Sequence, residues 1–139
     1  MLAAAFIILG TAVVLGAVLA VLHLRSGTAG APPQRPPHRP PDRPPDRPPW
    51  PFAALHGSLA VAGLACLALA LRGPPRGLDH GTASFGVIAA VLLTLAALVG
   101  ARLLTARVFN RPIAAATIGI HATLAVSGFV ILAAYIFAG

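Results

Sequence analysis

Four long apolar runs alternate with polar segments along the chain. Each run has or approaches the roughly 20 residues that cross the hydrocarbon core of a bilayer as a helix. Because lipid offers no hydrogen-bond partners to a backbone, helix is the expected form of all four. The pattern predicts an all-α membrane protein, a four-transmembrane-helix up-down bundle. The runs are Leu2 to Leu24, Phe52 to Leu71, Ala83 to Ala101 and Ile113 to Ala138. With flanking residues, the expected helices are 1–25, 52–72, 83–106 and 112–138, with a linker at 26–51 and an outer loop at 73–82.

The first run also has a feature of a secretory signal peptide, because the small residues Ala29-Gly30-Ala31 follow it. Against cleavage, no Arg or Lys precedes this run. Its 23 residues also exceed the roughly 7–15 of an ordinary signal-peptide core. We therefore expect the first helix to be retained.

Composition agrees with a membrane protein. The 139 residues are 58% hydrophobic and only 9% charged, whereas a soluble domain carries about 25% charge. The net charge is +7, and all ten basic residues are Arg. These arginines lie beside apolar runs with few aromatic residues between them, which favours anionic lipid headgroups over nucleic acid as their partner. The single cysteine, Cys66, excludes an internal disulfide.

Most arginines lie on one predicted side of the membrane. Eight of the ten belong to the connections after the first and third runs, and only Arg72 and Arg76 belong to the connection after the second. Because arginine-rich loops stay in the cytoplasm, both chain termini are expected outside, with the bacterial inner membrane as the expected location. The eight are Arg25, Arg35, Arg39, Arg43, Arg47, Arg102, Arg107 and Arg111.

The linker between the first two runs is rich in proline. It contains four near-copies of one tetrad, RPPH, RPPD, RPPD and RPPW, beginning at Arg35. Such a sequence favours an extended polyproline II conformation, which packs no core. We expect a solvated cytoplasmic spacer; the alternative is a docking site for a partner or for the membrane surface. Trp50, at its end, is an expected interfacial anchor.

The second and fourth runs share a motif. LHGSLAVAGLACLALAL begins at Leu55 and IHATLAVSGFVILAAYI at Ile120, and seven of their 17 aligned positions are identical. The identities include His56 with His121 and Gly63 with Gly128. Seven residues, about two turns, separate each His from its Gly, so both lie on one face of their helix.

The first and third runs match only weakly, through Phe6 and Phe85 near their starts. The pattern nevertheless predicts two helical hairpin repeats. In an up-down bundle of such repeats, the second and fourth helices are diagonal neighbours that face each other across the core.

An ionisable side chain inside an apolar helix is costly and usually faces a partner, a cavity or a cofactor. Two inward imidazoles at similar depth on diagonal helices can supply both axial ligands of haem b, which favours electron transfer over oxygen chemistry. His56 and His121 are therefore the candidate metal ligands. Gly63 and Gly128 would let a flat macrocycle or another backbone approach closely. Four arginines border the same half and are candidate partners of the haem carboxylates: Arg107, Arg111, Arg102 and Arg25. His23 is expected at the membrane interface and His80 in the outer loop.

With this histidine placement, the chain resembles the small four-helix membrane b-type cytochromes. Relatives of the cytochrome b561 kind carry two histidine pairs, whereas this chain offers one pair. The resemblance implies a single-haem electron carrier that exchanges electrons with a quinone or with a larger respiratory-type membrane complex.

Three other functions compete with this one. The histidines can instead hydrogen-bond a neighbouring helix in a non-catalytic structural or assembly subunit of a membrane complex. A small transporter built from two-helix repeats is disfavoured, because the three acidic residues, Asp42, Asp46 and Asp79, all lie in predicted loops. Independent enzymatic activity has the least support, because the sequence lacks a nucleophile–base pair, a carboxylate dyad, HExxH and a phosphate-binding glycine loop.

Overall fold

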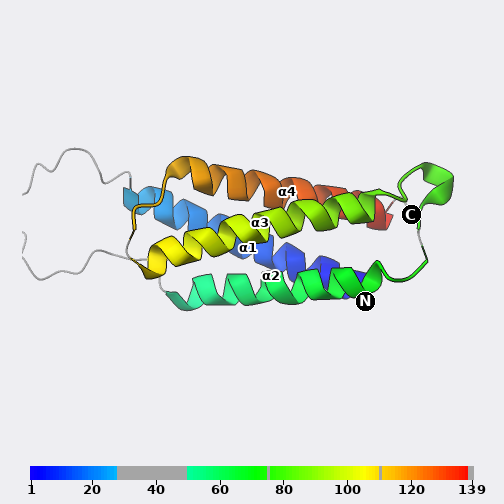
Figure 1. Ribbon diagram of the computed structural model, residues 1–139, viewed down its shortest axis with the longest axis horizontal. Coiled ribbons are helices and arrows are strands. Elements are labelled where there is room, and N and C mark those ends of the chain that lie inside the picture. Colours follow the sequence, from blue (N-terminus) through cyan, green and yellow to red (C-terminus); the bar gives the residue numbers. More distant parts are fainter. Residues whose placement is uncertain (28–49, 75, 110, 138–139) are drawn as a thin grey trace, which may run out of the picture.

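The computed structural model describes residues 1–27, 50–74, 76–109 and 111–137 (Figure 1). These residues form four α-helices and one short 3-10 helix. Each α-helix is long and apolar enough to cross a membrane, so the prediction of an all-helical membrane-type chain is confirmed at this level. Of the predicted proline-rich linker, residues 28–49 lie outside the described residues. The elements are α1 (Leu2–Gly27), α2 (Trp50–Ala70), η1 (Leu78–His80), α3 (Phe85–Val108) and α4 (Ala115–Phe137).

The starts of α2 and α4 differ from the expected starts at residues 52 and 112. Helix α2 begins earlier, at Trp50, because Pro51 fits the first turn of a helix, where its missing N–H costs nothing. Helix α4 begins later, at Ala115. As a result His56 and His121 are each the seventh residue of their helix.

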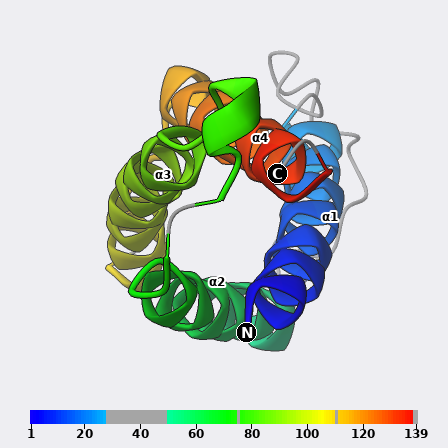
Figure 2. The ribbon, with the colours of Figure 1, turned by 90° about the vertical axis from the view of Figure 1, so that its right-hand side faces the viewer.

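Successive α-helices run in opposite directions and surround a common axis. In Figure 1, α1 and α3 run from right to left, and α2 and α4 run back. Figure 2 shows the four helices as a closed ring in the order α1, α2, α3, α4. The most extensive contacts join α1 to α2 and α3 to α4. Over the described residues, the backbones of α2 and α4 do not come close to each other, nor do those of α1 and α3, so each of these is a diagonal pair.

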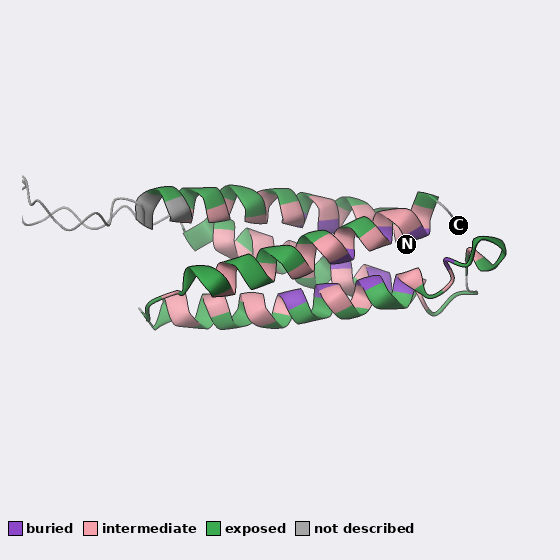
Figure 3. Cartoon of the chain, turned by 90° about the horizontal axis from the view of Figure 1, so that it is seen from above, coloured by how far each residue is buried: buried purple, intermediate pink, exposed green. Residues whose placement is uncertain are grey.

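The tightly packed core occupies only one half of the bundle. On α1 and α3, the last fully buried residues are Ala12 and Ala96; on α2 and α4, the first are Gly63 and Gly128. The buried positions in Figure 3 accordingly gather toward the end that carries both termini. We call this end the packed half, and the half where α1 and α3 end and α2 and α4 begin the histidine half. The core cluster consists of Ala5, Leu9, Leu67, Ala89, Leu93, Leu132 and Tyr135.

A histidine site between the diagonal helices

His56 on α2 and His121 on α4 approach each other across the bundle. Their ring centres lie 5.9 Å apart, and their ring planes form an angle of 81°. Both side chains are half-buried. The structure therefore brings the two imidazoles together at one level, at the boundary between the packed half and the histidine half.

Each imidazole is held by the helix that precedes its own. Nδ1 of His56 lies 2.9 Å from the carbonyl oxygen of Ala12 on α1, and Nδ1 of His121 lies 2.8 Å from the carbonyl oxygen of Ala96 on α3. A carbonyl oxygen can only accept a hydrogen bond, so Nδ1 of each ring donates its N–H. In a neutral imidazole with hydrogen on Nδ1, the lone pair is on Nε2. Both rings are thus in the tautomer that binds a metal through Nε2.

A glycine lies against each ring. A Cβ atom added at Gly16 would be 2.7 Å from Cε1 of His56, and one added at Gly100 would be 2.9 Å from Cε1 of His121. A side chain at either position would displace the ring from its hydrogen bond. Gly16 and Gly100 therefore set where the imidazoles lie, and neither was among the predicted site residues.

A repeated pattern in α1 and α3 is the sequence signal that finds these glycines. Both helices contain L-x-x-A-x-x-x-G-A, from Leu9 in α1 and from Leu93 in α3. The alanines supply the carbonyl oxygens and the glycines contact the rings. In this pattern the alanine and the glycine, not the leucine, indicate which residues contact the histidines.

Gly63 and Gly128, which the sequence places in the cofactor site, contact leucines in the structure. A Cβ atom at Gly63 would be 2.6 Å from Cγ of Leu9, and one at Gly128 would be 2.8 Å from Cγ of Leu93. Both glycines are buried at the edge of the packed half. These are helix-packing contacts, in which Gly63 lets α1 approach α2 closely and Gly128 lets α3 approach α4 closely.

The structure separates two of the predicted cationic residues. Arg107 lies in the last turn of α3 and is half-buried, whereas Arg111 lies exposed in the connection to α4. His23 is also half-buried, near the end of α1, while His80 is exposed in η1 at the opposite end of the bundle. Only His23 and Arg107 of these four belong to the same half as the histidine pair and are partly covered by protein.

The chemistry available to the pair is limited by the number of ligands. Over the described residues, no group of three or more His, Cys, Asp or Glu side chains can hold a metal ion. The pair can therefore supply two nitrogen ligands and no more. That donor set suits a metal whose other ligands come with it, as in a macrocycle, better than a bare ion such as Zn²⁺, which takes three or four protein ligands.

Comparison of the chain with protein-family models, with curated proteins and with solved structures finds no match.

Proposed function

We propose that the protein is an integral membrane electron carrier of the b-type cytochrome kind, with one haem b held between α2 and α4 by His56 and His121. The observation that carries this proposal is the pair of Nδ1–H hydrogen bonds to Ala12 and Ala96. Because Nδ1 donates in both hydrogen bonds, the Nε2 lone pair of each ring is available to bind a metal. Each ring is also held in place by a backbone carbonyl oxygen of a neighbouring helix. Such outer hydrogen bonds orient histidine ligands and raise their basicity.

The separation of the rings supports the same proposal. A histidine nitrogen lies about 2 Å from the transition metal it binds, so two imidazoles on opposite sides of one iron have ring centres about 6 Å apart. The observed 5.9 Å agrees with that geometry. When bound, the haem iron would supply one-electron chemistry, and two nitrogen ligands would leave it no open position.

The uneven packing of the bundle also supports it. In the packed half, inward positions such as Leu67 and Leu132 are completely covered by other side chains. In the histidine half, the inward positions Gly16 and Gly100 are only half-buried by the protein itself. A bundle that closes tightly at one end and incompletely at the other fits a bound group at the open end.

The proposed architecture is an up-down bundle of two duplicated hairpins. In support, each hairpin carries the same contacts at equivalent positions: His to Ala carbonyl, His ring to Gly, and Gly to Leu. The arginine bias supports an orientation with the histidine half toward the cytoplasm and both termini outside, and the proposed location is a bacterial inner membrane.

The partner, a quinone or a larger respiratory-type complex, would exchange electrons at the histidine half. Apolar side chains, among them Leu9, Leu67, Leu93 and Leu132, fill the bundle between the histidines and the other end. With a single haem on one side of this apolar packing, electron exchange at one face of the membrane is favoured over electron transfer across the membrane.

The absorption spectrum of the purified protein tests the proposal. We expect a Soret band and sharp low-spin bands in the reduced protein. His56→Ala and His121→Ala are each expected to abolish the low-spin spectrum, while His80→Ala in the exposed η1 loop leaves it unchanged. A colourless, folded protein that takes up no added haem would contradict the proposal.

The same hydrogen bonds favour a second function. A histidine that donates to a carbonyl of a neighbouring helix fastens two helices without any ligand. The alternative is therefore a non-catalytic structural or assembly subunit of a membrane complex. In that case His56→Ala and His121→Ala would lower the stability of a colourless protein.

A further inference from the structure

The inward face of α1 and α3 extends past the glycines to two polar residues. His23 follows Gly16 by seven residues, and Arg107 follows Gly100 by seven residues. Seven residues are about two helical turns, so each pair shares one face of its helix. Both polar side chains are half-buried, whereas Leu22 and Val108, which neighbour them in sequence, are exposed.

His23 and Arg107 are equivalent positions of the two hairpins. The 84 residues that separate Ala12 from Ala96 and Gly16 from Gly100 also separate His23 from Arg107. They lie on the diagonal helices α1 and α3, while the imidazole pair lies on α2 and α4. Each is about 10 Å farther along its helix than the neighbouring glycine, toward the open end of the bundle.

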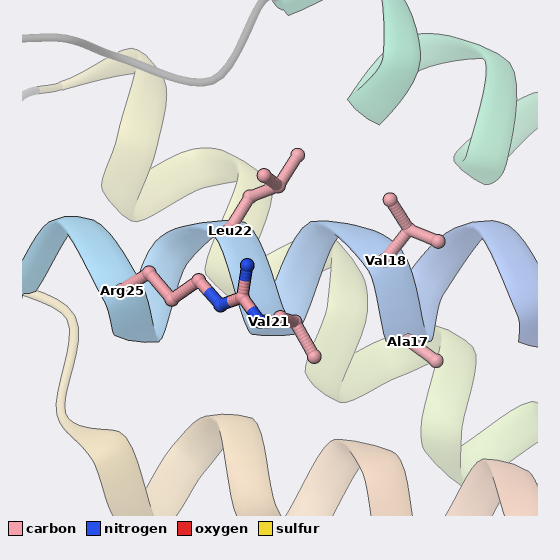
Figure 4. Close-up of a pocket in the computed structure, with 5 residues that line it drawn as sticks. All are labelled: Ala17, Val18, Val21, Leu22 and Arg25. Carbon is pink, nitrogen blue, oxygen red and sulfur yellow. The ribbon is translucent and has the colours of Figure 1, made fainter.

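The other arginines of this half lie on different faces. Arg102 follows Gly100 by two residues, which places it on the opposite side of α3, and it is exposed. Arg25 follows Gly16 by nine residues. Nine residues are about two and a half turns, so Arg25 lies on the side of α1 opposite Gly16. Figure 4 shows Arg25 with Ala17, Val18, Val21 and Leu22, exposed residues that line a shallow groove on the outer surface of α1.

We propose that His23 and Arg107 bind the two carboxylates of the haem, one from each diagonal helix; this inference rests on the proposed function. A carboxylate at the edge of a membrane interior is costly unless a hydrogen-bond donor or a cation accompanies it. The Arg guanidinium is the best match for a carboxylate because it donates two parallel hydrogen bonds. An imidazole donates at least one N–H in either protonation state. The two carboxylates hang from one edge of the macrocycle, and both proposed partners lie at the open end.

Haem release measured with two forms of the pigment tests this assignment. The protein is loaded with haem b or with haem b dimethyl ester, whose carboxylates are esterified, and release to a haem scavenger is timed. The variants are His23→Ala, Arg107→Ala and the double variant. Arg102→Ala and Arg111→Ala are the matched controls, because both are exposed arginines of the same half. Should an alanine variant fail to fold, His23→Gln and Arg107→Lys keep a donor at the site.

For haem b, each alanine variant is expected to speed release by about tenfold or more, the range for loss of a hydrogen bond to a charged group. The control variants should release at the wild-type rate. With the dimethyl ester, wild type should release as fast as the double variant does with haem b, and the substitutions should have no further effect. Intermediate rates for His23→Gln and Arg107→Lys would support the assignment.

Two results would overturn the inference. Equal acceleration by Arg107→Ala and Arg111→Ala would mean that charge near the membrane, not this position, matters. Slow release of the dimethyl ester from wild type would show that the carboxylates are not held. In both cases the wild-type protein still binds haem, so the proposed function stands; a wild-type protein that binds neither pigment removes both proposals together.

Discussion

The imidazole of His56 stands almost at right angles to that of His121, with 81° between the ring planes. Neither orientation is set by its own helix alone. A carbonyl oxygen and a glycine of α1 position the first ring, and the equivalent atoms of α3 position the second. The pair is thus a property of all four helices, and changes on α1 and α3 should alter it as strongly as changes beside the histidines.

Alanine at Gly16 or Gly100 should weaken haem binding while the helices still form. The new Cβ would push the imidazole away from its carbonyl partner, since it would lie less than 3 Å from Cε1. Overpacking of this kind costs roughly 1–3 kcal/mol, which corresponds to about a five- to 150-fold loss of affinity. Titration of the apoprotein with haem measures the change.

Gly57→Ala and Gly119→Ala are the controls for that experiment. They lie on α2 and α4 near the histidines. Apart from the adjacent residues and the backbone of the same helix, no described atom lies within 4 Å of a Cβ added at either position. Both should bind haem as wild type does. Equal affinities for Gly16→Ala and Gly57→Ala would show that the glycine beside the ring has no role in the site.

Alanine at Gly63 or Gly128 should lower stability and leave the pigment unchanged. Here the added Cβ meets Leu9 or Leu93 in the packed half, with an expected cost of about 1–3 kcal/mol in the free energy of unfolding. Unfolding in detergent measures it, and Leu9→Ala in the Gly63→Ala background should recover part of the loss. Loss of pigment at wild-type stability would instead place these glycines in the cofactor site.

Carbon monoxide should not bind the reduced wild-type protein. Two imidazole ligands leave the iron no open position, so the difference spectrum with and without the gas should be flat. His121→Ala, where it retains haem, opens one position and should give a carbon monoxide spectrum. A full carbon monoxide spectrum in wild type would mean that one of the two histidines does not bind the iron.

The four helices and the histidine pair could be predicted from sequence for simple reasons. Long apolar runs have few alternatives to helix in lipid. His56 and His121 stand out in their runs, so the alignment of the second and fourth helices is unambiguous. This alignment predicts that the two rings face each other at one level, which agrees with the 5.9 Å between their centres.

The residues that hold the rings could not be predicted in the same way. Phe6 and Phe85 suggest an offset of 79 residues between the odd helices, whereas the site contacts have an offset of 84, from Gly16 to Gly100. The two aromatic residues have different surroundings, and Phe6 stacks on Phe129 of α4, at 4.9 Å between ring centres. Phe85 is the first residue of α3 and packs against the core cluster.

The alignment of α1 with α3 at an offset of 84 residues is hard to detect because it depends on small residues. Alanine and glycine are common throughout the chain, so Ala12 with Ala96 carries little weight by itself. The alanines act through a backbone carbonyl oxygen and the glycines through the absence of a Cβ atom. Neither property is evident from the residue type in the sequence. For the same reason the sequence places Gly63 and Gly128 beside the cofactor, although their nearest contacts are leucines.

The electron paramagnetic resonance spectrum of the oxidised protein at low temperature tests the central claim most directly, because it reports both the number and the relative orientation of the axial imidazoles. With His56 and His121 on one iron and their planes near 81° apart, we predict the strongly anisotropic low-spin ferric signal of perpendicular imidazoles. The signal should be lost in either His→Ala variant. A high-spin axial signal from wild type, or no ferric haem signal from protein incubated with haem, would contradict the account.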